Sequence, residues 1–151
     1  MLRRIILIVA LFVFVVGCGR ADDDVADEES AEAAYVGLDL AIEKMMGLGF
    51  DGFNAATSAN IPVQSTDGEA TGTLVVTGKV DQGASANKGM RLNIELDEYS
   101  DETDPEAPYI ITYDTDPEEL PFLELQLRDI PNGTLSGTFS GPVHMSGTLT
   151  G

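Results

Sequence analysis

An alternation of apolar and polar residues in the second half of the chain most constrains what this protein can fold into. It is clearest at residues 90–97, where the apolar residues Met90, Leu92, Ile94 and Leu96 alternate with Arg91, Asn93, Glu95 and Asp97. Because successive side chains of a β-strand point to opposite faces, this period of two predicts a strand with one buried and one solvated face. A sheet of such strands has to bury its apolar face against another element of the chain.

Further segments carry strand signals of the same kind, at residues 72–80, 109–113, 123–127, 135–139 and 143–149, with short turn-forming stretches between them. The side chains expected to face inward include Leu74, Val76, Val80, Leu123, Leu125, Leu127, Leu135, Gly137, Phe139, Val143, Met145 and Leu149. Consecutive strands joined by brief turns predict an antiparallel meander of about six strands. The last strand either closes this sheet or belongs to a longer β-protein.

The segment before the strands has a helical period instead. Between Ser30 and about Met46, one helix face is expected to consist of Tyr35, Leu38, Ile42 and Met45, bordered by Ala34 and Ala41. Ser30 or Asp27 is the expected N-cap, and Gly47 and Gly49 are expected to end the helix before a loop from Leu48 to Asn60. The predicted fold is therefore α+β, with an N-terminal helix packed on a coiled antiparallel sheet.

Residues 1–17 have the pattern of an export signal. Arg3 and Arg4 precede an unbroken apolar run from Ile5 to Val16, which is shorter than the roughly 20 apolar residues that a membrane-spanning helix needs. The sequence Val15-Val16-Gly17-Cys18 follows, and it resembles the lipobox of bacterial lipoproteins. The alternative is an ordinary signal peptide with a cysteine near its end by chance.

The lipobox resemblance implies a specific modification of Cys18, the single cysteine of the chain. Its sulfur would receive a diacylglyceryl group, cleavage would follow between Gly17 and Cys18, and the new amine would be acylated, with palmitate among the expected chains. Two or more acyl chains anchor a protein stably to a membrane. Gly19 after the cysteine implies the outer membrane, and the lipidated protein would have no free thiol left for a disulfide or a thiolate metal site.

Residues 18–30 are expected to form the lipidated cysteine and an acidic tether. Asp22, Asp23, Asp24, Asp27, Glu28 and Glu29 stand there against a single Arg20. Like charges at this density keep a segment extended, so a plain spacer is favoured over an acidic docking arm. Residues 31–151 are expected to form one domain. The formal net charge of −18 excludes nucleic acid as a partner, since such a surface repels phosphates.

Two short acidic segments are candidates for a calcium site. Thr103-Asp104-Pro105-Glu106 recurs as Thr115-Asp116-Pro117-Glu118, and the candidate ligands are Asp104, Glu106, Asp114, Asp116 and Glu118. Calcium takes six to eight oxygen ligands, which two neighbouring acidic loops could supply. The alternative is that each Asp caps a turn, with Pro in the first position and Glu near its positive end. No other cofactor is expected.

Catalytic signals are absent from the sequence. His144 is the single histidine, and the alternation around it predicts that it faces solvent, while Ser140 and Ser146 lie in no nucleophile elbow. A second pattern, Gly-Thr followed by Leu or Phe, recurs at Gly72, Gly133, Gly137 and Gly147. These glycines either permit close packing and sheet coiling or leave room for a ligand.

The sequence therefore predicts a lipid-anchored, non-enzymatic protein of the outer membrane, acting as a structural or interaction module with an unknown protein partner. One alternative is a carrier that holds an apolar ligand between helix and sheet, and another is a calcium-binding module. A hydrolase is the least favoured reading, because it would require His144 to meet both an acid and a hydroxyl.

Overall fold

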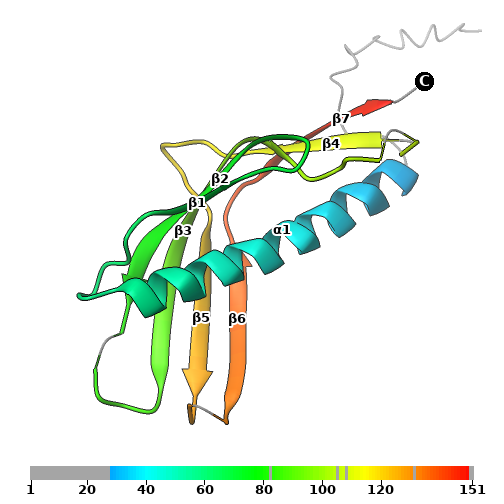
Figure 1. The fold of residues 1–151 in the computed structure, drawn as a ribbon. Coiled ribbons are helices and arrows are strands. Elements are labelled where there is room, and N and C mark those ends of the chain that lie inside the picture. The colour runs from blue at the N-terminus through cyan, green and yellow to red at the C-terminus, as the bar shows by residue number, and fades with distance from the viewer. Residues whose placement is uncertain (1–27, 82, 105, 108, 131, 150–151) are drawn as a thin grey trace, which may run out of the picture.

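The computed structural model describes residues 28–149, apart from positions 82, 105, 108 and 131. This part of the chain forms one helix followed by an antiparallel sheet of seven strands, which confirms the α+β class (Figure 1). The elements are α1 (Glu28–Ala55), β1 (Gln64–Asp67), β2 (Thr71–Val80), β3 (Lys88–Ser100), β4 (Tyr109–Asp114), β5 (Phe122–Arg128), β6 (Thr134–Ser140) and β7 (His144–Leu149). The strand beyond the expected six or so is β1, whose four residues include no apolar one and so show no alternation.

β3 is the central strand of the sheet. One edge of β3 pairs with β2, and the other pairs first with β5 and then, at Tyr99 opposite Tyr113, with β4. Between these two pairings, the amide of Ile94 donates to the Pro121 carbonyl and the amide of Thr115 donates to the Leu96 carbonyl, at 2.9 and 3.0 Å. β4 and β5 therefore act as one strand, interrupted by residues 116–120. On the far side from β3, β7 pairs with β4 and β6 pairs with β5, so β6 and β7 form a second interrupted strand.

The sheet bends where these strands are interrupted, so that β4 and β7 turn away from β5 and β6 (Figure 1). In the neighbouring strands, Gly72 and Glu98 both have positive φ, at 70° and 45°, and the β2–β3 register shifts at this point. A side chain at Gly72 would collide with the carbonyl groups of Asp97 and Glu98. The bend is therefore a bulge that depends on glycine.

The alternation correctly predicts the buried face of the central strands. Its apolar members on β2, β3 and β5 are buried at Leu74, Val76, Val80, Met90, Leu92, Ile94, Leu96, Leu123 and Leu125, and Leu127 is partly buried against the core. The prediction is wrong for β6, where Leu135 is 48% exposed and Gly137 is exposed, while Phe139 alone packs against the core. The main contacts of α1 are with β1 to β4, and this outer strand lies outside them.

The helix is longer than the glycines predict. It continues through Gly47 and Gly49 to Ala55, so the expected stop and the expected loop from Leu48 are both wrong, and Ser30 lies inside the helix rather than at its cap. Gly49 faces Leu92 and Gly52 faces Ile61 so closely that any side chain there would meet them. Packing against these residues outweighs the cost of glycine in a helix, which is about 1 kcal/mol each.

The face of α1 that contacts the sheet is shifted from the expected one, and Tyr35 is the one residue of the expected face that is exposed. Ala34, Ala41 and Met45 are buried, Leu38 and Ile42 pack at the edge, and Tyr35 is 71% exposed. Because small residues occupy the contact face, the helix axis approaches the sheet closely. Bulky residues such as Tyr35 are left on the flanks.

Candidate functional site

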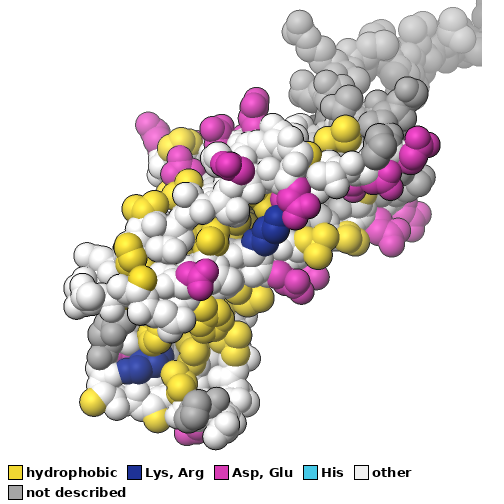
Figure 2. Space-filling model, in the orientation of Figure 1, with side chains coloured by type: hydrophobic (Ala, Val, Ile, Leu, Met, Phe, Trp, Pro, Cys, Tyr) yellow, Lys and Arg dark blue, Asp and Glu magenta, His cyan; other side chains and the backbone are white. Residues whose placement is uncertain are grey.

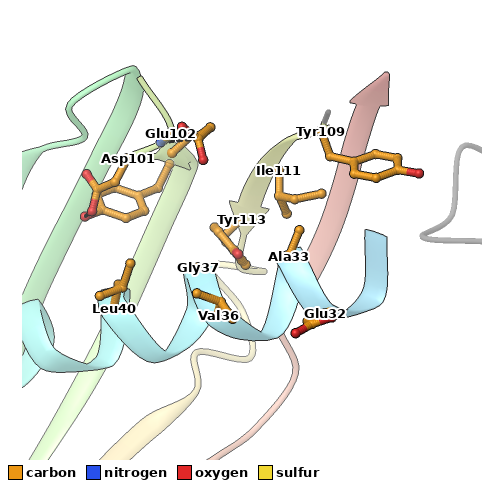
Figure 3. A pocket seen from close by; sticks show the side chains of 12 residues that line it. Glu32, Ala33, Val36, Gly37, Leu40, Asp101, Glu102, Tyr109, Ile111 and Tyr113 are labelled. Carbon is orange, nitrogen blue, oxygen red and sulfur yellow. Dashed lines mark hydrogen bonds between the residues drawn. The ribbon is translucent and has the colours of Figure 1, made fainter. Parts of the chain in front are cut away.

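A pocket of about 350 Å³ opens between the first half of α1 and the bent end of the sheet. Ala33, Val36, Gly37 and Leu40 line it from the helix, and Ile111 and Tyr113 line it from β4 (Figure 3). The remaining lining residues are Glu32, Tyr99, Ser100, Asp101, Glu102 and Tyr109. The pocket exists because the sheet bends here, which separates β4 from the half of the sheet that carries most of the core.

Three tyrosines form the aromatic part of this pocket, and two of them are held by their hydroxyl groups. Tyr113, which is 3% exposed, donates to the carbonyl oxygen of Ala34 at 2.7 Å. Gly37, one turn further along α1, leaves the space that this hydroxyl occupies. Burial raises the pKa of Tyr113 to about 12, so its hydroxyl stays protonated and remains a donor at neutral pH.

Tyr99 is fixed at the other end of the pocket by Asp101. Its hydroxyl donates to Asp101 Oδ2 at 2.6 Å, and the residue is 1% exposed. Burial and the hydrogen bond to Asp101 raise the pKa of Tyr99 to about 12. The ring is therefore neutral and rigidly placed at physiological pH.

Asp101 is the centre of a polar cluster at the edge of the pocket. Its Oδ2 lies 2.8 Å from Lys44 Nζ, and its Oδ1 accepts the amide of Glu69 at 3.0 Å. Burial favours the neutral carboxyl, but the hydrogen bonds from Lys44, Tyr99 and the Glu69 amide together hold the pKa of Asp101 below its ordinary value. The cluster joins the middle of α1 to the β1–β2 turn and to the end of β3.

Lys44 is the cation of this cluster. Its ammonium also lies 3.4 Å from Glu69 Oε1 and 6.0 Å from the centroid of the Tyr99 ring. Burial alone would lower the pKa of Lys44, but the hydrogen bond to Asp101 and the nearby negative charge raise it above its ordinary value. Lys44 is therefore a structural cation and not an activated amine.

The rim of the pocket combines exposed apolar side chains from the helix with acidic side chains from the helix and from the end of β3. Val36 and Leu40, one turn apart on α1, are 56% and 53% exposed and line the pocket beside one another. Glu32 and Glu102 are exposed lining residues. Figure 2 shows acidic side chains spread over this face of the molecule, with hydrophobic side chains between them and few basic ones.

No protein-family model, curated protein or solved structure matches this chain.

The two acidic loops have the geometry of capped turns. In each loop the first Asp accepts the amide two residues later: Asp104 from Glu106 at 2.9 Å and Asp116 from Glu118 at 2.8 Å. The carboxylate of Asp114 accepts the amide of Glu98, so it contributes to the sheet bulge. Among the described residues, no group of three or more His, Cys, Asp or Glu side chains is placed to hold a metal ion.

The other residues singled out in the sequence lie away from the pocket. His144 is exposed on β7, as the alternation predicts, and Ser140 and Ser146 are exposed as well. Ser146 pairs with the hydroxyl of Thr112 at 2.6 Å across the β4–β7 ladder. Gly17, Cys18 and the acidic segment before residue 28 lie outside the described residues. No helix in the described part of the chain is long and apolar enough to cross a membrane.

The sequence reasoning missed the residues that make the pocket. The sequence patterns assign no functional role to Tyr99, Tyr109, Tyr113 or Lys44. A strand pattern identifies which side chains point inward, but it does not identify where the sheet bends away from the helix. The strand glycines considered as room for a ligand lie elsewhere, since Gly37 of α1 is the glycine that lines the pocket.

Proposed function

We propose that this protein is a membrane-tethered, non-enzymatic binding module whose pocket between α1 and β4 holds an apolar group. The observation that carries the proposal is the pocket itself, an aromatic and aliphatic recess of about 350 Å³ with a few polar groups at its edge. Ligand sites in proteins commonly have this character and a volume of roughly 300–1,000 Å³.

The exposure of Val36 and Leu40 supports the same function. In a chain with a net charge of −18, the two side chains remain half in solvent beside the pocket. A bound apolar group would cover them, and burial of apolar surface contributes about 25 cal/mol per Å².

Anchoring is the second part of the proposal. Lipidation of Cys18 would attach the domain to the outer membrane, and the acidic segment behind it would hold the domain at a short distance from the surface. Binding is favoured over catalysis because His144, the single histidine of the chain, is on β7 and does not line the pocket.

The experiment is a titration of the full chain with 1-octanol, followed by tyrosine fluorescence. The chain has no tryptophan and four tyrosines, three of which line the pocket, so its intrinsic emission reports on this site. We expect saturable binding that the variant Ala33→Phe abolishes by filling the pocket. The matched control is Ala55→Phe, at an exposed position near the end of α1, which should bind as the original chain does. Binding that Ala33→Phe leaves unchanged would overturn the proposal.

A further inference from the structure

We infer that the ligand of this pocket is a small amphiphilic cation, in which an alkylated ammonium group is joined to a short apolar chain. This inference rests on the proposed function and adds the charge of the ligand to it. Three features of the described residues point to a cation: the aromatic lining, the carboxylates around it, and the position of Lys44.

The aromatic lining suits a cation because the faces of tyrosine rings carry negative electrostatic potential. An ammonium group within about 6 Å of a ring centroid is attracted to it, and several rings around one space form the usual cage for quaternary ammonium ligands. Tyr99 and Tyr113 are already fixed by their hydroxyl bonds to Asp101 and to the Ala34 carbonyl. Binding of a ligand would therefore cost little conformational entropy for these two rings.

The charged residues of the lining are all acidic. They are Glu32, Asp101 and Glu102, and no described lining residue is Lys, Arg or His. Lys44 compensates Asp101, but Glu32 and Glu102 have no ion pair with a described Lys or Arg. A carboxylate or phosphate on the ligand would meet this negative field with no cation in the lining to pair with it. A cation would be attracted both by the lining and by the net charge of the chain.

Lys44 shows that the same residues bind an ammonium group. Its Nζ lies 2.8 Å from Asp101 and 6.0 Å from the Tyr99 ring centroid, and both partners also line the pocket. The protein therefore already places one ammonium group against a tyrosine and a carboxylate. The pocket offers a larger version of this environment, with Tyr113 as a further ring and Val36 and Leu40 as a surface for an apolar chain.

The test compares three probes that share one alkyl chain: octyltrimethylammonium, 1-octanol and octyl sulfate. Each is titrated into the full chain at low and at moderate salt, below its micelle concentration, with tyrosine fluorescence as the readout. We expect octyltrimethylammonium to bind on the order of tenfold more tightly than octanol at low salt, and octyl sulfate to bind more weakly than octanol. The preference for the cation should shrink as salt rises.

The outcomes separate this inference from the proposed function. Equal affinity for all three probes, or tighter binding of octyl sulfate, would overturn the cation preference while the pocket remained a binding site. Absence of saturable binding by every probe would overturn both.

Paired variants locate the charge effect. Glu32→Gln combined with Glu102→Gln should remove most of the preference for octyltrimethylammonium over octanol, and the glutamine oxygen at 102 can still accept the Asp104 amide. The matched control is Glu95→Gln combined with Asp97→Asn, which removes two charges from exposed positions on β3 outside the pocket. If the control pair lowers the preference as much as the pocket pair, the overall charge of the chain would be responsible and the inference would fail.

Discussion

The hydroxyl of Tyr113 on β4 donates a buried hydrogen bond of 2.7 Å to the carbonyl oxygen of Ala34 on α1. The two residues are 79 positions apart in the chain, and the bond joins the bent end of the sheet to the helix beside the pocket. The bond holds Tyr113, which lines the candidate site from β4, against α1, which lines the opposite side.

Removal of this hydroxyl should destabilise the domain. Tyr113→Phe keeps the ring but loses the bond, and a neutral hydrogen bond contributes about 0.5–1.5 kcal/mol to the free energy of unfolding. Urea unfolding monitored by circular dichroism measures this change. Tyr35→Phe is the control, because Tyr35 is 71% exposed and its substitution should change the free energy of unfolding by less than about 0.5 kcal/mol. Equal effects of the two substitutions would show that the bond contributes nothing.

Two glycines of α1 should respond to alanine in opposite directions. A side chain at Gly47 meets nothing within 4 Å, so Gly47→Ala should stabilise the helix by about 0.5–1 kcal/mol. A side chain at Gly37 would collide with the Tyr113 hydroxyl, so Gly37→Ala should destabilise the protein. In a Tyr113→Phe background the cost of Gly37→Ala should shrink, and a double-mutant cycle based on urea unfolding would measure this coupling. Additive effects would contradict the collision.

The cluster around Asp101 should make the free energy of unfolding depend on pH in the acidic range. The pKa of Asp101 is lowered in the folded protein, so its contribution is present above the unfolded pKa of about 3.9 and is lost as pH falls through the lower folded value. Asp101→Asn should cost about 1 kcal/mol at pH 7, the lower end for a charged hydrogen bond because the Lys44 side chain is 35% exposed. The cost should shrink as pH falls below the unfolded pKa and should disappear once pH is below the lower folded pKa. Asp97→Asn, at an exposed position on β3, is the control substitution. A cost for Asp101→Asn that is constant with pH would rule out the charged interaction.

The buried tyrosines Tyr99 and Tyr113 should make the free energy of unfolding depend on pH in the alkaline range as well. Their folded pKa values are raised to about 12, against about 10 in an unfolded chain. Their contribution is therefore fully present below about pH 10 and is lost as pH rises through 12, and the raised pKa of Lys44 acts in the same direction. The measurement is the free energy of unfolding between pH 9 and pH 12, with tyrosinate absorbance recorded in parallel. The free energy should fall over the same pH range in which the buried tyrosines ionise. Tyr113→Phe should reduce the slope, and ionisation of every tyrosine before any loss of stability would contradict the burial.

The lipid anchor can be tested separately from the pocket. In a bacterial host that processes lipoproteins, the full chain should fractionate with membranes and incorporate labelled palmitate. Cys18→Ser should lose both properties, because the thiol is the proposed site of acylation. Membrane association of Cys18→Ser together with a retained N-terminal segment would indicate an uncleaved signal instead.

The local patterns of the sequence determined the class of this fold. The alternation at residues 90–97 predicted which side chains of β3 are buried, because a strand of period two has no other way to place its apolar residues out of water. The repeated Asp-Pro-Glu segments likewise predicted their own turns, since the Asp104 and Asp116 caps involve amides only two residues away. Interactions of this range can be inferred from neighbouring residues alone.

Only the tertiary structure decided the length of α1, its contact face and the position of the pocket. Gly47 and Gly49 predict a helix end locally, but Leu92 of β3 packs against Gly49 and Ile61 packs against Gly52, and the helix continues. The pocket depends on the bulge at Gly72 and Glu98, which turns β4 away and leaves Tyr99, Tyr109 and Tyr113 around one space. These outcomes depend on contacts between residues far apart in the chain, whose combined free energy exceeds the local preferences that the sequence displays.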